Sequence, residues 1–230
     1  LHFVLDGAVP CGDGFFVFSD PQEPNIVYYQ FQFGALFRKD LTTGKSTDIM
    51  PKTEIGETAL RCNWMTPFIL SQHNHLTLYF GAQKLFKSLD RGDSWYAVSP
   101  DLTTNPGPGK QGDITYGTIT TISESRFQPG LLYVGTDDGN IHVSRNDGVT
   151  WEKINRGLPD RWVSRVIASR YEKESVYAAL TGYRQDDFAC YLYRSADFGK
   201  TWVSIGSNLP GESVNVIRED PKNKNILYVG

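Results

Sequence analysis

An eight-residue pattern of polar side chains, a glycine and a tryptophan occurs three times in this 230-residue chain, at 88–95, 144–151 and 195–202. It reads Ser-x-Asp-x-Gly-x-Thr-Trp, with small variations. Short polar side chains at this spacing bind backbone N–H groups in a tight turn, the glycine supplies a positive φ, and the tryptophan anchors the outgoing strand. We therefore predict three copies of one β-hairpin with these structural residues: Ser88, Asp90, Gly92, Trp95, Ser144, Asn146, Gly148, Trp151, Ser195, Asp197, Gly199 and Trp202.

A second repeated element places a tyrosine in five short apolar segments, and a serine or aspartate stands eight residues before each tyrosine. Neighbouring tyrosines are 44 to 54 residues apart, the length of one four-stranded blade of a propeller. The tyrosines are Tyr28, Tyr79, Tyr133, Tyr177 and Tyr228. Their common register predicts five units, at about 8–55, 60–100, 114–156, 161–206 and an incomplete 212–230.

Short strands and turns explain the composition, which includes 22 Gly, 12 Pro, 12 Tyr and 13 Phe, whereas helical periodicity is hard to find. In the third unit we expect strands at 118–123, 131–135, 141–144 and 151–154. Their apolar runs are short and often β-branched, as in strands that neighbouring sheets cover on both faces. We therefore predict an all-β β-propeller with four-stranded antiparallel blades, in a partial ring of about four and a half blades.

The eight-residue pattern resembles the Asp-box, or BNR repeat, of sialidases, family 74 glycoside hydrolases of the xyloglucanase type and sortilin/Vps10 receptors. Residues 12–28, 116–125, 133–151 and 214–230 are also similar to segments of large bacterial BNR-repeat glycosyl hydrolases and sortilin-like propellers. The resemblance implies a β-propeller, an extracellular or periplasmic location, and a sugar or protein ligand. Asn146 departs from the pattern at the acid position, but asparagine makes the same turn.

The fifth unit stops at Gly230, before any third strand. A propeller closes its ring to hide strand edges, so this pattern favours a fragment whose partners are the remaining blades of a longer propeller. Alternatively, residues 1–5 complete the last blade of a closed five-bladed ring.

Charge and motif content exclude several classes of partner. The 23 Lys and Arg and 26 Asp and Glu residues give a net charge of −3 and are spread along the chain, so we expect no nucleic-acid partner. No apolar run approaches the length of a membrane span, so we expect no membrane insertion in this segment. His73 and His75 are expected to be surface turn residues, and we expect no metal or other cofactor.

The three cysteines match no zinc or redox spacing. Cys11 and Cys62 each stand nine residues before equivalent positions of neighbouring units, which would place them side by side on adjacent inner strands. A disulfide between them is therefore a hypothesis. Cys190 is expected to be a buried apolar residue.

The connectors differ most between units. Residues 101–115 (DLTTNPGPGKQGDIT) are rich in Pro and Gly and predict a long surface loop. Residues 181–190 (TGYRQDDFAC) are inserted in the fourth unit and are expected to project from the rim, where Arg184, Asp186 and Asp187 form a charged contact or a solvated loop.

Candidate functional residues lie before and at the start of the first strand of each unit, where a propeller surrounds its central channel. Asp13 and Asp113 are the candidate catalytic pair because glycoside hydrolysis needs two facing carboxyl groups, although each could instead cap its own turn. Aromatic side chains there could stack on sugar rings or pack between blades, and arginine or asparagine could bind hydroxyls or a carboxylate. The candidate ligand-binding residues are Arg61, Asn63, Trp64, Tyr116, Trp162 and Arg165.

Two functions follow from these residues. The first is a ligand-binding or scaffolding propeller module that recognises a glycan or a peptide at the loop face. The second is a glycoside hydrolase that cleaves a polysaccharide, with its acid and base on this segment or on other blades. A sialidase is disfavoured because the Arg-Ile-Pro motif is absent and Arg61, Arg165 and Arg218 occupy different registers. The fold class supports the first two functions equally.

Overall fold

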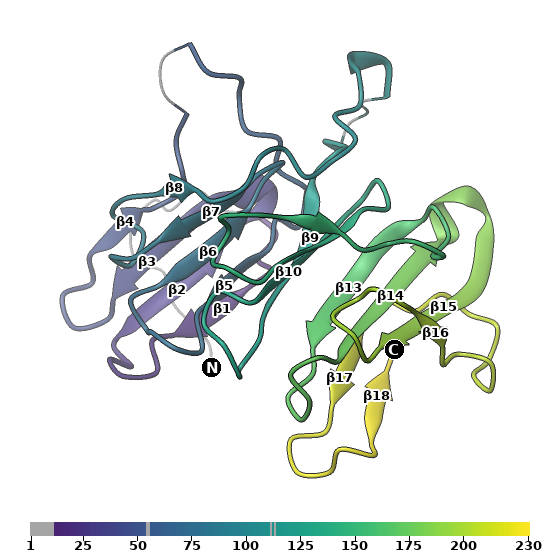
Figure 1. Ribbon diagram of the computed structural model, residues 1–230. Coiled ribbons are helices and arrows are strands. Elements are labelled where there is room, and N and C mark those ends of the chain that lie inside the picture. The colour runs from purple at the N-terminus through teal and green to yellow at the C-terminus, as the bar shows by residue number, and fades with distance from the viewer. Residues whose placement is uncertain (1–11, 54–55, 111, 113) are drawn as a thin grey trace.

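A computed structural model describes residues 12–53, 56–110, 112 and 114–230 (Figure 1). The described residues form four four-stranded sheets and a two-stranded sheet, all antiparallel and with strands in sequence order. Each sheet lies within one of the five predicted spans. The strands are β1 (Val17–Ser19), β2 (Ile26–Gln30), β3 (Leu36–Asp40) and β4 (Ser46–Asp48); β5 (Phe68–Leu70), β6 (Leu78–Gly81), β7 (Leu85–Ser88) and β8 (Tyr96–Ala97); β9 (Ile119–Glu124), β10 (Leu132–Thr136), β11 (Ile141–Ser144) and β12 (Glu152–Lys153); β13 (Trp162–Ala168), β14 (Val176–Gly182), β15 (Asp187–Ser195) and β16 (Val203–Ser204); and β17 (Ile217–Glu219) and β18 (Leu227–Val229).

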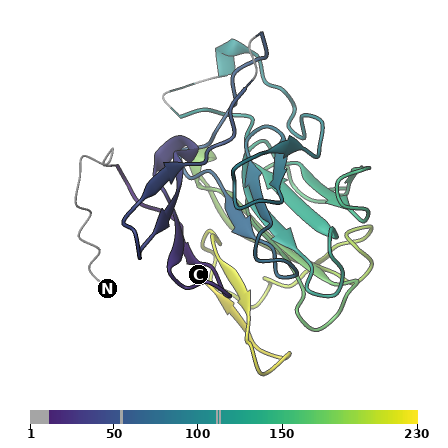
Figure 2. The same cartoon turned by 90° about the vertical axis from the view of Figure 1, so that its left-hand side faces the viewer.

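Within the described residues, helical structure is confined to three short 3₁₀ turns, η1 (Gln32–Gly34), η2 (Pro108–Lys110) and η3 (Tyr183–Gln185). In the described part of the chain, no helix is long and apolar enough to cross a membrane. The loop that contains η2 extends away from the sheets in both views (Figures 1 and 2), as expected for residues 101–115.

The sheets follow one another along an arc, from the first sheet (purple) to the β17–β18 hairpin (yellow) (Figures 1 and 2). The first strands of neighbouring sheets pack against each other, because β9 contacts β5 and β13, and β13 contacts β17. The predicted all-β fold with four-stranded blades in a partial ring is confirmed.

One apolar cluster joins each sheet to the next. In the third sheet, Tyr133 belongs to the cluster shared with the fourth sheet, whereas Leu132 and Val134 belong to the cluster shared with the second. Alternate side chains of one strand thus face opposite neighbours. This explains why β10 and β14 are buried along their whole length.

The three eight-residue hairpins repeat one set of hydrogen bonds. In the third copy, Ser195 Oγ donates to Asp197 Oδ1 (2.7 Å) and accepts from the Gly199 N–H (2.8 Å). Thr201 donates its N–H and its hydroxyl to the same carboxylate. These bonds, with those of Thr201 largest, lower the pKa of Asp197 to about 2. The matching serine bonds of the other copies are Ser88 to Asp90 (2.8 Å) and Ser144 to Asn146 (3.1 Å).

The same hairpins also attach each sheet to the one before it. The Trp202 indole N–H donates to the Ile154 carbonyl at 2.6 Å. Gly199 has φ +87°, and a Cβ there would lie 2.3 Å from Ile154 Cδ1, so both the turn and the close approach require glycine. The two other hairpins repeat these contacts, with Trp151 and Gly148 against Val98 and with Trp95 and Gly92 against Ile49.

At the inner end of the sheets, β9 and β13 each carry one bulged residue, Thr120 and Ser164. The Thr120 hydroxyl donates across to the Val163 carbonyl of the next sheet (2.6 Å), and the Ser164 hydroxyl donates to the Val214 carbonyl (2.8 Å). A bulge redirects the side chains that follow it. These hydroxyl contacts therefore hold neighbouring first strands together where the strand register shifts.

His73 and His75 lie in the turn between β5 and β6, as expected, and they also contact neighbouring sheets. His73 Nε2 is 2.8 Å from the Ser125 carbonyl oxygen, and His75 Nδ1 is 3.0 Å from the Asp20 carboxylate. The turn is therefore attached to the first sheet through Asp20 and to the third sheet through Ser125.

Cys62 is a buried free thiol, and burial raises its pKa to about 12. Its proposed disulfide partner, Cys11, lies outside the described residues. Cys190 is half-buried and packs against the apolar cluster between the fourth sheet and the β17–β18 hairpin, as expected of an apolar residue.

Candidate functional site

A cavity of about 430 Å³ lies where the first strands of all five units begin. Each unit contributes lining residues from the loop before its first strand or from the start of that strand, so the cavity occupies the centre of the loop face. The described lining residues are Phe16, Asn63, Trp64, Met65, Ile114, Thr120, Trp162, Ser164, Arg165, Thr181, Tyr183, Arg184, Asn215 and Val216.

Two polar groups of the lining have no hydrogen-bond partner, Arg165 Nε and Thr181 Oγ1, and both atoms are buried. Arg165 directly follows the bulge at Ser164. Burial, and then the nearby Arg218, lower the pKa of Arg165. The guanidinium therefore has unused donors in a partly desolvated position, where hydrogen-bonding an anion or a hydroxyl is most favourable.

The charged side chains among the described lining residues are all positive. Arg165 and Arg184 are the cations, and the described lining residues include no Asp or Glu. Of the described carboxylates, none lies within ion-pair distance of Arg165, although several other arginines of the chain have acidic partners. The cavity is therefore positively charged in a chain whose net charge is −3.

Arg184 lies between two aromatic rings. Its Cζ is 4.0 Å from the centroid of Trp162 and 4.4 Å from that of Tyr183. Cation–π contacts of this geometry orient a guanidinium while its N–H edge stays available. One face of Trp162 is therefore occupied by Arg184, and a sugar ring could stack only on the other face or after Arg184 moves.

The prediction that residues 181–190 project from the rim is wrong for Tyr183 and Arg184. The insertion lengthens the β14–β15 hairpin, and Tyr183 and Arg184 of η3 line the cavity. An ion pair between Arg161 Nε and Asp187 Oδ2 at 2.8 Å holds the base of the hairpin, and the Tyr191 hydroxyl donates to the same carboxylate. The cation–π contacts and this ion pair hold the insertion beside the cavity.

Four of the six candidate ligand-binding residues line the cavity: Asn63, Trp64, Trp162 and Arg165. Trp64 packs edge-on against Phe33, with ring centroids 5.0 Å apart. Asn63 is buried, and its amide donates to Thr118 Oγ1 (2.9 Å) and to Asp137 Oδ2 (3.2 Å). Both N–H groups of Asn63 are engaged within the protein, so this side chain supports the cavity wall.

Arg61 and Tyr116 are absent from the described lining. The Arg61 guanidinium binds Asp101 (2.6 Å), Thr103, Asn105 and the Gly117 carbonyl, and so ties together the two ends of the long loop before β9. Burial, and then Asp138, raise the pKa of Tyr116 to about 12. The structure thus gives Arg61 a loop-holding role in place of the ligand contact we predicted.

The candidate catalytic pair is not assembled by the described residues. Asp13 is exposed and is absent from the lining, and Asp113 lies outside the described residues. The sequence prediction missed a buried acid, Asp137, which accepts bonds from the Thr118 hydroxyl (2.6 Å) and from the Gly117 and Thr118 N–H groups. Burial outweighs these bonds and raises the pKa of Asp137 to about 6.

Among the lining residues that sequence analysis did not predict, three belong to the insertion in the fourth unit: Thr181, Tyr183 and Arg184. The available signal was the insertion itself, because long loops on a rigid scaffold often carry binding residues. Its placement could not be read from the sequence, because it depends on contacts with Trp162 at the start of β13 and with Arg161 just before that strand.

Comparison with known proteins identifies the fold, although no family model matches the chain. The vacuolar protein sorting/targeting protein 10 of Arthroderma benhamiae and that of Trichophyton verrucosum are each 26% identical over 113 residues, which cover 49% of this chain and 7% of theirs. The GH74 xyloglucanase from Xanthomonas campestris matches 90% of this chain with a TM-score of 0.64 and 16% identity. The chain is a Vps10- and GH74-like β-propeller. The Dos1 propeller matches 91% of it, with a TM-score of 0.63 and 14% identity.

This propeller spans only part of the proteins it resembles. It covers 7% of the two curated relatives, 32% of the xyloglucanase and 53% of the Dos1 propeller. At identities of 14 to 16%, the solved structures establish the fold alone. The function must therefore be argued from the cavity.

Proposed function

We propose that this propeller is a ligand-binding module whose central cavity holds a glycan or an extended peptide through a carboxylate. The observation that carries the proposal is Arg165, which lines the cavity with a buried, unpartnered Nε and no acidic neighbour in the described lining. A guanidinium binds a carboxylate with two parallel hydrogen bonds, which supplies both energy and orientation. Trp64 and Trp162 add flat apolar surface beside it.

The two possible sources of the carboxylate, an acidic sugar and a peptide, are distinguished by binding measurements on a defined panel. The panel contains uronate and neutral oligosaccharides, and peptides with free or amidated carboxyl groups. We expect Arg165→Met to weaken the best ligand by roughly tenfold or more, whereas Arg156→Met, an exposed arginine outside the cavity, leaves the affinity unchanged. Equal affinity in the Arg165→Met variant, or no binding by any member of the panel, would refute the proposal.

A second proposal is a glycoside hydrolase that acts on a polysaccharide. It is favoured by the likeness to the xyloglucanase fold. Hydrolysis requires two carboxyl groups roughly 5 to 9 Å apart across the scissile bond, with Asp13 and Asp113 as the residues to test. Release of reducing ends from β-glucans and xyloglucan that is lost in Asp13→Ala or Asp113→Ala would support this function. Release from no substrate would exclude it for this chain.

We also propose that the module works in an exported or lumenal compartment. The support is the likeness to the Vps10 proteins and to a solved structure described as an extracellular domain, from B. thetaiotaomicron, with a TM-score of 0.60. Fractionation of cells that produce the full-length protein tests this, and recovery in the cytoplasm alone would contradict it.

A further inference from the structure

Two arginines of the fourth unit line the central cavity, and they differ in exposure. Arg165 lies in β13 and its Nε is buried, whereas Arg184 lies in η3, directly after β14, and is exposed. Strand β13 contacts both β9 and β17, so the fourth unit has a described neighbour on each side. The surroundings of the two arginines are therefore set by sheets that the structure describes.

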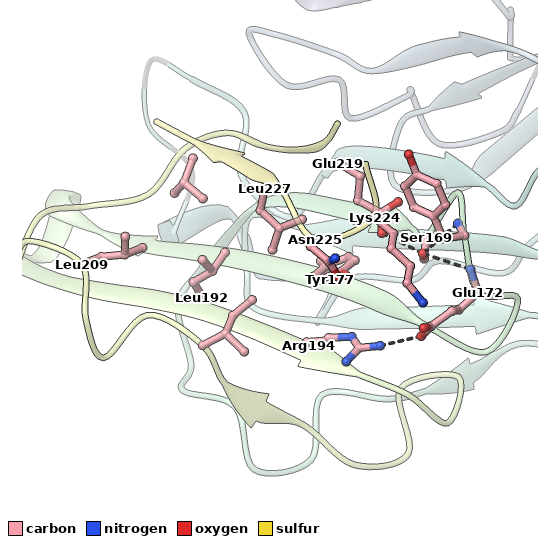
Figure 3. Close-up of a pocket in the computed structure, with 13 residues that line it drawn as sticks. Ser169, Glu172, Tyr177, Leu192, Arg194, Leu209, Glu219, Lys224, Asn225 and Leu227 are labelled. Carbon is pink, nitrogen blue, oxygen red and sulfur yellow. Dashed lines mark hydrogen bonds and ion pairs between the residues drawn. The ribbon is translucent and has the colours of Figure 1, made fainter. Parts of the chain in front are cut away.

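A second cavity shows an arginine whose charge is balanced by the protein. A groove of about 410 Å³ is lined by residues of the fourth sheet and of the β17–β18 hairpin, and it shares no lining residue with the central cavity. Its arginine, Arg194, forms an ion pair with Glu172 (Figure 3). In the central cavity, by contrast, no described carboxylate lies within ion-pair distance of Arg165 or Arg184, and the described lining contains no acid. The protein leaves both of these positive charges uncompensated.

The acids that follow Arg184 in the sequence do not neutralise it. Asp187 accepts from Arg161 Nε (2.8 Å) and from the Tyr191 hydroxyl (2.7 Å), so its carboxylate is engaged at the base of the hairpin. Asp186 ends η3 in the left-handed conformation with φ +56°, is exposed, and forms no ion pair with Arg184. The positive charge of Arg184 is therefore available to a ligand.

Aromatic contacts and strand register place Arg184 near Arg165. The rings of Trp162 and Tyr183 hold the Arg184 guanidinium by its faces, which leaves its N–H edge free for an anion. Trp162 pairs with Thr181 and Arg165 pairs with Ala179, two ladder positions away, because Ser164 is bulged. Two positions correspond to about 7 Å along a strand. One ligand of modest length can therefore reach both guanidinium groups.

We propose that Arg184 binds a second anionic group, so that the ligand of the central cavity carries two carboxylates, one at Arg165 and one at Arg184. This inference rests on the proposed function, because it concerns the same ligand. Two like charges in one cavity repel each other, and each carboxylate that enters relieves this repulsion in addition to pairing with its own guanidinium. A ligand with one carboxylate leaves Arg184 uncompensated. The cavity therefore selects ligands with two carboxylates over those with one.

Matched ligands that differ by one carboxylate test this inference on the full-length protein. The peptide pairs have a free C-terminal carboxylate and either Glu or Gln at one of the preceding positions. The sugar pair is digalacturonate with both carboxyl groups free or with one methyl-esterified. Calorimetric titration at low salt compares the unmodified protein with Arg165→Met, Arg184→Met and the exposed control Arg156→Met, which lies outside the cavity.

We expect the member with two carboxylates to bind about fivefold more tightly than its matched partner, the gain of a partly exposed ion pair. Arg184→Met should remove this difference and leave the affinity for the monocarboxylate within about twofold, which also shows that the cavity is intact. Arg165→Met should weaken both members of the pair, and Arg156→Met should weaken neither. A gain confined to the peptide pairs or to the sugar pair supports the inference and identifies the source of the carboxylates.

Two results would overturn this inference while the proposed function stands. One is equal affinity of the unmodified protein for both members of every pair. The other is equal weakening of both members by Arg184→Met, which would make Arg184 a structural residue of η3. Binding that Arg165→Met does not change, or binding of no ligand at all, would overturn the proposed function and this inference together.

Discussion

The outer hairpins and the central cavity differ in how their polar groups are paired. In the hairpin at 195–202, the hydroxyls of Ser195 and Thr201, the carboxylate of Asp197 and the indole N–H of Trp202 all have partners. In the cavity, Arg165 Nε and Thr181 Oγ1 are buried without one.

The outer hairpins therefore serve stability, and the central cavity serves the proposed binding, within a single fold. The hairpin contacts recur in three units and join each sheet to its neighbour, so they stabilise the arc. Both unpaired groups belong to the fourth unit, and leaving a buried polar group unpaired lowers stability. Such a cost at the centre of a cavity is typical of a site whose partner is a ligand.

The largest expected effect concerns the hairpin anchor. Trp202→Ala should lower the free energy of unfolding by about 3 kcal/mol, because the indole packs against the apolar cluster of the third and fourth sheets and bonds Ile154. The matched variant Trp202→Phe retains most of the packing and should lose about 1 kcal/mol, the value of one hydrogen bond. Urea denaturation measures both. A loss below about 1 kcal/mol for Trp202→Ala would show that the hairpin does not anchor the sheets.

The next effect concerns two titratable groups of the third unit, the buried Asp137 and the half-buried His142. The pKa of Asp137 is raised to about 6, so between pH 4 and 6 the folded protein binds more protons there than the unfolded chain, and stability falls as pH rises. Burial, and then Lys153, lower the pKa of His142 to about 4, so at this residue the folded protein binds fewer protons between pH 4 and 6.5, and stability rises with pH.

The two contributions oppose each other over almost the same pH range, so the unmodified protein should show little net slope from them. His142→Gln should expose the Asp137 contribution, with stability falling by about 2 kcal/mol from pH 4 to pH 6. Asp137→Asn should expose the opposite slope. Denaturation series at several pH values test both variants, and slopes of the same sign would contradict the assignment.

A pair of hydroxyl deletions compares the two regions directly. Ser195→Ala removes a hydroxyl that accepts from the buried Gly199 N–H, and should destabilise by about 1 kcal/mol. Thr181→Val removes a hydroxyl that has no partner and should stabilise by about 1 kcal/mol. Thermal and urea unfolding of both variants provide the measurement. Destabilisation by Thr181→Val would mean that its hydroxyl is paired in solution.

The smallest expected effect compares two copies of the hairpin. Asn146 occupies the position that Asp197 holds in the third copy, and it accepts from Ser144 and Thr150. Asn146→Asp replaces neutral acceptors with a carboxylate and should raise stability by about 0.5 kcal/mol at neutral pH, because bonds to charged acceptors are stronger. The gain should disappear below the pKa of the new acid. No gain at neutral pH would show that the copies are energetically equivalent.

The sequence predicted the fold well because the repeated contacts are local or periodic. The spacing of the tyrosines located the sheets, and the third-unit strands begin and end within about two residues of the predicted bounds. The cavity was predicted less completely. Trp64, Trp162 and Arg165 line the cavity, whereas Arg61 lies outside its described lining. The four partners of Arg61 are 40 to 56 residues away in the sequence, so its contacts could not be predicted from local spacing.

The sequence by itself determined the hairpins, because the bonds among Ser195, Asp197 and Thr201 close within seven residues and need no distant partner. Only the tertiary structure decided which side chains meet at the centre. Arg184 lies over the ring of Trp162 because β13 pairs with β14 up to Trp162 and Thr181, and Arg165 Nε is left unpaired because no described acid lies within ion-pair distance. Burial and pairing depend on side chains from neighbouring sheets. The repeat period predicts the order of these sheets along the chain, but it does not predict how their side chains are oriented.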